Sequence, residues 1–212
     1  MRARKRAAAV AERLAGEYPD ARCELDFRSP WELLVATMLS AQCTDVRVNR
    51  VTPDLFARWP EPADLAAAAQ EEVEAVIRST GMYRRKAAAL RAAARVVAEE
   101  HGGVPPPDID ALVALPGVGR KTAKVVLGEG FGVAAGVTVD THVRRLAQRL
   151  GLTNLEDAER IAAELEGILP RNQWISFSTR MILHGRRVCS ARSPRCDGCV
   201  LAEVCPRVGV KR

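Results

Sequence analysis

The chain of 212 residues is long enough to bury a substantial core, in one large domain or two small ones. Its 32 lysines and arginines outnumber its 26 aspartates and glutamates, and this positive charge favours a polyanionic partner. No stretch resembles a secretory signal, and none is long and apolar enough to span a bilayer, so we expect no membrane partner. Four of the six cysteines crowd together like a ligand set, which favours a reducing compartment, the cytosol, over a disulfide framework.

The chain is typical of an all-α protein throughout, because alanine is abundant, aromatics make up only 4%, and alternating β-branched runs are absent. Val10 to Tyr18 has the i+4 apolar spacing of a first helix. Ser29-Pro30-Trp31-Glu32 is a strong helix start, with a Ser cap, Pro at the first position and Glu at the capping-box position. The helix that it opens, through Leu33 to Leu39, is apolar nearly all round, which predicts a buried central helix. Further helices are expected over residues 46–56, 65–69, 71–78 and 83–100.

Residues 109–128 contain two short helical patterns separated by a Pro-Gly-Val-Gly turn. The two glycines permit a sharp turn and a close approach of the backbone to a ligand. The second helix begins near Arg120 and Lys121, where unpaired N–H groups and the helix dipole favour an anion, and in a basic chain a nucleic-acid phosphate is the favoured one. The alternative is a plain helix–turn–helix connection. The hairpin alone does not distinguish an enzyme from a DNA-binding module.

The second half continues the helical pattern after a loop expected over Gly128 to Gly136. Asp140 is placed to cap a helix that runs to Leu150, and Asn154 is placed to cap another that ends before Pro170. The last helix is expected over residues 174–187.

Four cysteines crowd the end of the chain in the pattern Cys-x6-Cys-x2-Cys-x5-Cys, at Cys189, Cys196, Cys199 and Cys205. Four thiolates within so short a loop can enclose one compact metal centre, either tetrahedral zinc or a [4Fe–4S] cluster. Ligand chemistry alone does not decide between them. Disulfides are disfavoured by the intracellular context.

Four motifs together resemble the endonuclease III family of DNA glycosylases. They are the Leu-Pro-Gly-Val-Gly-Arg-Lys-Thr-Ala hairpin, the Val-Asp-Thr-His segment at 139–142, the Leu-Ser-Ala-Gln segment at 39–42, and the cysteine loop after His-Gly-Arg at 184–186. The resemblance covers nearly the whole chain in the expected order. It implies two packed helical domains, a helical barrel over residues 26–136 with the hairpin at about 109–128, and an iron–sulfur domain formed by residues 1–25 and 137–212.

The resemblance also implies a [4Fe–4S] cluster on the four cysteines, and duplex DNA with damaged bases or abasic sites as the partner. We expect a monomer, because no exposed apolar heptad or spare helix is evident, and a location in the cytoplasm on the nucleoid. The implied activity is a bifunctional glycosylase and AP lyase for oxidised pyrimidines such as thymine glycol. The implied DNA contacts include the hairpin turn and the arginines near the cluster loop, namely Gly117, Val118, Gly119, Arg186 and Arg192.

The catalytic pair implied by the resemblance is Lys121 and Asp140. The positive helix end and neighbouring cations disfavour a protonated Lys121 amine, and a neutral amine can form a Schiff base with deoxyribose C1′. On the hairpin alone, a phosphate-binding lysine is at least as well supported. Asp140 has an N-cap as its alternative role, and a carboxylate can cap with one oxygen and face a site with the other.

The resemblance further offers Gln42 and Met82 as the side chains that fill the space left by a flipped base, one by hydrogen bonding and one as an apolar wedge. Many relatives have Leu at the position of Met82. The alternatives are a polar residue at a helix end and a core methionine.

Two rival functions remain at this stage. An adenine or mismatch-specific glycosylase of the same superfamily is one, although adenine glycosylases use a glutamate in the first buried helix and Leu33 to Leu39 contains no carboxylate. A non-catalytic, metal-stabilised DNA-binding module is the other, and it leaves the coincidence of Lys121 and Asp140 unexplained.

Overall fold

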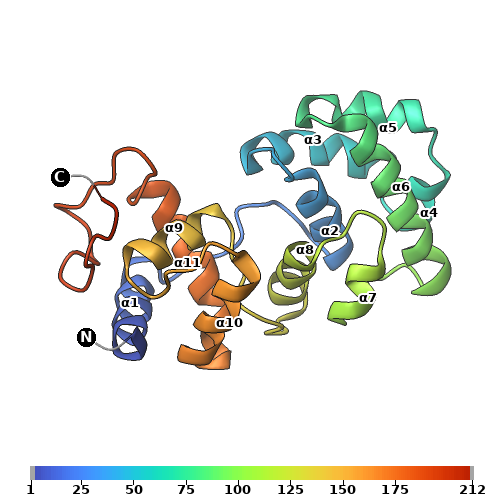
Figure 1. The fold of residues 1–212 in the computed structure, drawn as a ribbon. Coiled ribbons are helices and arrows are strands. Elements are labelled where there is room, and N and C mark those ends of the chain that lie inside the picture. The colour runs from blue at the N-terminus through green and yellow to red at the C-terminus, as the bar shows by residue number, and fades with distance from the viewer. Residues whose placement is uncertain (1–2, 211–212) are drawn as a thin grey trace. The chain divides into compact units, whose positions relative to one another are not determined.

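The computed structural model describes residues 3–210, and these residues form helices and irregular segments with no β-strand among them (Figure 1). The all-α prediction is confirmed. No helix within residues 3–210 is both long enough and apolar enough to cross a membrane. The α-helices are α1 (Ala3–Glu17), α2 (Pro30–Leu39), α3 (Asp45–Arg58), α4 (Pro62–Ala67), α5 (Gln70–Ile77), α6 (Tyr83–Glu100), α7 (Ile109–Ala114), α8 (Arg120–Val125), α9 (Thr141–Arg149), α10 (Ala158–Ile168) and α11 (Trp174–Arg187).

The chain divides into two compact units. Cys23–Val133 forms one of them, which we call the central unit, and the chain up to residue 22 together with the chain from residue 134 onward forms the other, which we call the terminal unit. The corresponding domains predicted from the sequence are residues 26–136, and residues 1–25 with 137–212. Helices from opposite ends of the chain, the blue α1 and the orange-red α11, therefore share one unit (Figure 1).

Helix α2 is the centre of the central unit. Every residue from Trp31 to Leu39 is buried, as the all-round apolar pattern predicts. Neighbours surround it on several sides, because α3, α6, α8 and the π-helical turn Val126–Gly130 all contact it. A helix that is apolar on all faces is stable only when it is enclosed in this way.

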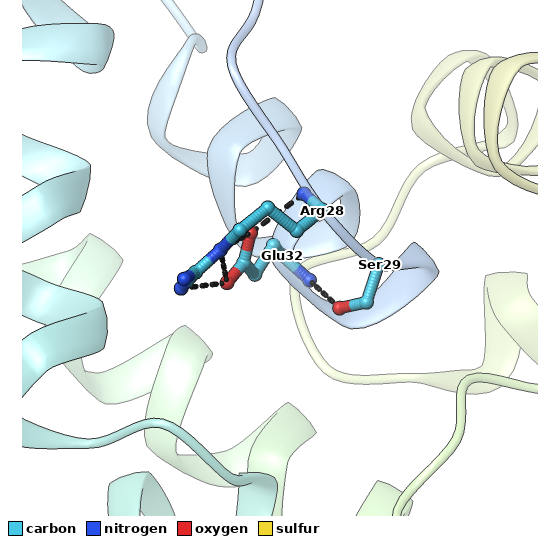
Figure 2. Close-up of polar contacts among 3 residues, drawn as sticks. All are labelled: Arg28, Ser29 and Glu32. Carbon is cyan, nitrogen blue, oxygen red and sulfur yellow. Dashed lines mark hydrogen bonds and ion pairs between the residues drawn. The ribbon is translucent and has the colours of Figure 1, made fainter.

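The start of α2 is held by a short polar network (Figure 2). Ser29 is the N-cap, and its Oγ accepts the Glu32 N–H at 3.2 Å. The Glu32 carboxylate reaches past the cap to the preceding residue, where it accepts the Arg28 N–H at 2.7 Å and the Arg28 guanidinium at 2.6 Å. The predicted capping residues are therefore correct, but the carboxylate binds the backbone of Arg28 in place of Ser29. These charge-assisted bonds satisfy the oxygens of a carboxylate that is buried.

The outer helices of the central unit pack around α6. Helices α4 and α5 lie against α6, and α3 lies against α5. Helix α6 has the predicted bounds, and its buried face carries Ala87, Leu90, Ala94 and Val97. Lys86 is buried on the same face, which is an unusual place for an ammonium group.

The terminal unit has its own core, built from α1, α9, α10 and α11. Helix α11 has the predicted bounds and contacts both α1 and α9. Val10 and Leu14 of α1 join Leu146 of α9 and Phe177 and Met181 of α11 in one buried apolar cluster.

Two predictions for the part of the chain that follows the hairpin turn are wrong. Residues 126–130 continue the hairpin's second helix as a π-helical turn, so the predicted loop from Gly128 begins later. Helix α10 is capped by Asp157, whose side chain accepts the Arg160 N–H at 2.9 Å, and Asn154 lies before the helix in an irregular segment. Both residues are good caps by type, and the helix begins at the later one.

Replacing Glu32 with Ala should lower the free energy of unfolding by about 1–2 kcal/mol, because the partly buried Arg28 N–H loses its acceptor at the start of α2. Urea denaturation followed by circular dichroism measures the loss. Glu99→Ala is the matched control, since Glu99 is exposed near the end of α6 and should change stability by less than about 0.5 kcal/mol. Equal losses in the two variants would contradict a role for the Glu32 network.

Candidate functional site

The predicted hairpin is present in the central unit as α7, a tight turn and α8. Asp108 caps α7 by accepting the N–H groups of Asp110 and Ala111. The turn is closed by backbone bonds from Leu115 to the Leu112 carbonyl and from Val118 to the Leu115 carbonyl. Since the Val118 side chain is buried and its N–H is used inside the turn, Val118 helps to form the hairpin from within.

The two turn glycines are required for different reasons. Gly117 has φ +77°, and a Cβ there would lie 2.7 Å from the Ala89 Cβ and 3.3 Å from the Met38 Cε. Only glycine fits this position. Gly119 has φ −90°, and no atom of the described chain lies within 4 Å of a Cβ built there. The protein itself therefore places no demand for glycine at Gly119, and its bare Cα leaves room for a ligand to approach the backbone.

Lys121 lies on the first turn of α8, with an exposed side chain that forms no hydrogen bond or ion pair with the residues that the structure describes. Gly119, the N-cap, offers no side-chain acceptor to the first N–H groups of α8. The amine is thus accessible at the positive end of a helix, as predicted. Lys124, one turn later, is buried.

Asp140 lies in the terminal unit and caps α9. Its Oδ1 accepts the N–H groups of His142 and Val143, each at 2.8 Å. Within residues 3–210, no hydrogen bond engages Oδ2, so one oxygen caps while the other is available for chemistry. Two hydrogen bonds anchor the irregular segment that precedes Asp140. The Val137 N–H is accepted by Glu166 at 2.8 Å, and the Thr138 N–H is accepted by the Ser178 Oγ at 2.9 Å.

Gln42 and Met82 both lie in the central unit, each in a turn after a helical segment. Both side chains are exposed, and Met82 is 42% exposed, which excludes the core-methionine alternative. Both have left-handed backbone, with φ 54° for Gln42 and 47° for Met82. Residues other than glycine rarely adopt this conformation, and such strain is concentrated at functional sites.

The four cysteines of the C-terminal loop line one cavity together with Arg149, Leu146 and His184. No group of three or more His, Cys, Asp or Glu side chains among the described residues is arranged around a single ion position. Burial and the neighbouring thiolates raise the pKa of the Cys199 and Cys205 thiols. Since four thiolates repel one another in such a cavity, the donor set fits a positively charged iron centre that would offset that repulsion.

Two arginines of α9 hold the start of the cysteine loop. Arg145 donates to the Cys189 carbonyl at 3.0 and 3.1 Å and to the Gly185 carbonyl at 2.9 Å. Arg149 donates to the Cys189 Sγ at 3.2 Å and to the Ser190 carbonyl at 2.7 Å. The carbonyl of Arg149 accepts the N–H of Val208 at 3.1 Å, so this residue contacts both ends of the loop.

A buried histidine contacts the cavity from α11. His184 Nε2 lies 3.3 Å from the Cys199 Sγ, and its Nδ1 lies 3.0 Å from the Tyr18 hydroxyl. Burial lowers the pKa of His184 to about 4, so the ring is neutral at pH 7. A metal-bound thiolate only accepts hydrogen bonds, which assigns the proton to Nε2 and makes Nδ1 the acceptor for Tyr18.

The predicted basic contacts lie around the same loop. Arg186, in the last turn of α11, and Arg192, within the loop, are both exposed. Arg195 is fixed against the end of α11, where its side chain donates to the Arg187 carbonyl. The terminal unit thus presents a cluster of cations beside the cysteine cavity.

Sequence reasoning missed three residues that support these features, namely Lys86, Arg145 and Arg149. It included His184 in the His-Gly-Arg segment but not the contact of this side chain with Cys199. Lys86 carried a signal, because it falls in register with the apolar stripe of α6. The two arginines follow Thr141 at i+4 spacing on one face of α9, but nothing in the sequence indicates that this face meets the cysteine loop.

Two family models match the chain. The model of HhH-GPD superfamily base excision DNA repair proteins matches residues 35–171, and that of the iron–sulfur binding domain of endonuclease III matches residues 189–205. The predicted [4Fe–4S] cofactor is thereby confirmed, with the four cysteines inside the second match.

Curated relatives are similar over most of their length. Endonuclease III from Synechocystis sp. is 51% identical, over 89% of this chain and 86% of the relative. The Bacillus subtilis enzyme is 44% identical over 95% and 91%, and the Escherichia coli enzyme is 39% identical over 92% of each chain.

Solved structures agree with this similarity. A trapped endonuclease III–DNA covalent intermediate has a TM-score of 0.92 and 41% identity, and covers 98% of this chain and 97% of its own. A non-covalent endonuclease III–DNA complex has the same TM-score and coverage at 42% identity. A thermostable thymine-DNA glycosylase has a TM-score of 0.86 at 23% identity, which supports the fold alone.

Arg149→Ala should release the cluster faster under a chelator, because the start of the cysteine loop loses the guanidinium bonds to the Cys189 Sγ and to the Ser190 and Ala191 carbonyls. Iron content measured over time gives the rate. Arg144→Ala is the matched control, since Arg144 is exposed on the same helix with no hydrogen bond from its side chain to the described residues. The same release rate in both variants would refute a holding role for Arg149.

Proposed function

The chain belongs to the endonuclease III family of the HhH-GPD superfamily, a family of DNA glycosylases and AP lyases of base excision repair, and on this basis we propose that it removes oxidised pyrimidines such as thymine glycol from duplex DNA. We propose that Lys121 is the nucleophile and Asp140 its carboxylate partner. The [4Fe–4S] cluster belongs to the same protein. We assign its four ligands to Cys189, Cys196, Cys199 and Cys205, which lie inside the matched residues 189–205.

The observation that carries the proposal is the accessibility of the Lys121 amine. Its amine is exposed on the first turn of α8, with no partner among the described residues, in a fold that matches endonuclease III bound to DNA. One of those matches is a trapped covalent intermediate with DNA, a species that requires a nucleophile of the enzyme. A lysine that only bound phosphate would form no covalent bond.

The proposed reaction begins with the damaged nucleotide rotated out of the duplex, because C1′ is inaccessible within the stack. The Lys121 amine attacks C1′ through its nitrogen lone pair, the C1′–N bond to the base breaks, and the base leaves with the electron pair and takes up a proton. Loss of the amine proton and opening of the sugar ring give an imine between Lys121 and C1′. Removal of a C2′ proton then expels the 3′ phosphate by β-elimination, and water hydrolyses the imine to free Lys121.

Asp140 would act on the charge that this reaction develops. Its Oδ1 is fixed by two backbone bonds to α9, so Oδ2 is the oxygen that would stabilise the cationic sugar and accept the proton from Lys121. This carboxylate is held in a fixed position, because the segment before it is anchored by bonds from Val137 to Glu166 and from Thr138 to Ser178. Lys121 and Asp140 belong to different units, and the family resemblance supports their pairing.

The proposed DNA contacts are made by the residues that were predicted from the sequence. The open backbone at Gly119 and the uncapped first turn of α8 would take a phosphate, with Gly117 and Val118 holding the turn in shape. Arg186 and Arg192 would add phosphate contacts from the terminal unit, and Gln42 and Met82 would fill the gap left by the flipped nucleotide.

The cluster, when bound, supplies a rigid cross-link of the loop, since its four cysteine ligands leave no open position for a substrate. The residues around it then hold the loop and its cations in place for DNA. We also propose that the protein acts as a monomer on damaged or abasic duplex DNA.

Lys121→Gln should lower base release and strand cleavage on a thymine glycol duplex by about a thousandfold or more, because the nucleophile is lost. Gel analysis of a labelled duplex measures both products. Lys5→Gln removes an exposed lysine of α1 and should leave both rates unchanged. Binding to a duplex with an uncleavable abasic analogue should persist in Lys121→Gln. Retained cleavage in this variant would eliminate Lys121 as the nucleophile.

Asp140→Asn should lower the same rates by about a hundredfold or more while leaving the thermal midpoint unchanged, since Asn caps a helix as well as Asp does but carries no charge. Asp140→Ala should lose the rate and also about 1 kcal/mol of stability, because the cap goes as well. Calorimetry and single-turnover kinetics separate the two effects. An Asn variant with wild-type turnover would assign Asp140 to capping only.

A further inference from the structure

Lys86 is a buried lysine that the proposed reaction does not use. Its side chain is 7% exposed, and its Nζ donates to two backbone carbonyls, those of Leu39 and Thr80, each at 2.8 Å. Leu39 is the last residue of α2, and Thr80 is the last residue of the 3-10 turn Arg78–Thr80. One ammonium group therefore joins the ends of two helical segments that are far apart in sequence.

The surroundings explain why a charged group is stable there. Carbonyls at helix C-termini lack partners within the helix and carry partial negative charge, so they favour a cation. Burial lowers the pKa of Lys86, and the neighbouring Cys43 acts in the opposite direction. A leucine or methionine would fill this place on the apolar face of α6 without burying a charge, but it would leave both carbonyls without the ammonium donor.

The two segments lead directly to the two candidate gap-filling residues. Gln42 follows Leu39 through the short turn Ser40–Ala41, and the Cys43 N–H closes this turn on the Ser40 carbonyl at 3.0 Å. Met82 follows Thr80 through Gly81, and the Met82 carbonyl accepts the backbone N–H of Lys86 at 3.0 Å. Lys86 thus contacts one segment through its side chain and the other through both side chain and backbone.

Backbone conformation points to the same two residues. Among the described residues, the non-glycine positions with positive φ are Gln42, Met82 and Arg207, and the first two directly follow the segments held by Lys86. A left-handed backbone persists at such residues only when surrounding contacts impose it. The bonds from Lys86 are contacts of that kind.

We propose that Lys86 is a positioning residue that fixes Gln42 and Met82 relative to each other, so that the two side chains enter the gap in the duplex as one preformed unit. The proposal rests on the proposed function, in which these two side chains fill that gap. Lys86 touches neither DNA nor the reacting atoms in this account. It acts on the step in which the damaged nucleotide leaves the stack.

The test compares an abasic site in duplex DNA with the same abasic site in a single-stranded oligonucleotide. Only the duplex requires gap filling, while the lyase chemistry at Lys121 is common to both. Lys86→Met keeps a long side chain and removes the ammonium, Lys86→Arg keeps a cationic donor, and Arg95→Met removes an exposed cation from the same helix.

Lys86→Met should lower the cleavage rate on the duplex by about ten- to a hundredfold while leaving the single-strand rate unchanged. Lys86→Arg should recover part of the duplex rate, and Arg95→Met should match wild type on both substrates. Equal losses of Lys86→Met on duplex and single strand, or no loss on either, would overturn the positioning role. Failure of the wild type to cleave either substrate would instead overturn the proposed function.

A second measurement decides the matter if Lys86→Met does not fold. A preformed unit predicts that Gln42→Ala and Met82→Ala are strongly non-additive on duplex cleavage, with the double variant losing little more than the worse single variant. Independent insertion of the two side chains predicts that the fold losses multiply. Multiplying losses would overturn the proposal.

Discussion

A helix that is buried on all sides places its two polar ends inside the protein, and this constraint shapes the central unit. At the N-terminal end of α2, Ser29 and Glu32 provide acceptors, and the carboxylate is paired with Arg28. At the C-terminal end, the Leu39 carbonyl accepts a hydrogen bond from the Lys86 ammonium. Each buried charge has the sign that the helix dipole requires, negative at the N-terminus and positive at the C-terminus. The residues that pair with the free backbone groups at the two ends of α2 therefore also fix the segments that precede and follow this helix.

The terminal unit shows an equivalent arrangement around α9. Asp140 caps the N-terminus of this helix, and Arg145 and Arg149 hold the first cysteine of the cluster loop from its later turns. Gly185 permits α11 to approach, since a Cβ there would lie 2.8 Å from the His142 Cβ. One short helix thus carries both the proposed catalytic carboxylate and the support of the cluster loop. A cluster that rigidifies the loop would by the same contacts steady α9.

Local chemistry made much of this architecture predictable from the sequence. The Ser-Pro-Trp-Glu start of α2, the full extent of α6 and α11, and the hairpin all depend on short-range signals. Asp140 was predictable as a cap for the same reason. The cysteine spacing left zinc and an iron–sulfur cluster equally open until the family resemblance was considered.

The remaining features depend on contacts between distant residues. Asn154 and Asp157 are both suitable caps by residue type, and α10 begins after the later one. The separate requirements at Gly117 and Gly119 become visible only when Ala89 and Met38 are placed against the turn. Lys86 was visible as a lysine in an apolar stripe, but its acceptor at Leu39 lies 47 residues away in sequence. These are the features that no local pattern encodes.

The central claim is that Lys121 forms a covalent bond with the sugar, and peptide mapping of a borohydride-reduced complex tests it most directly. Wild-type protein would be mixed with duplex DNA containing an abasic site, reduced, digested and sequenced by mass spectrometry. The account predicts that the sugar remnant is attached to the peptide containing Lys121, at that lysine. Attachment at another amine, or efficient strand cleavage with no reducible adduct, would contradict it.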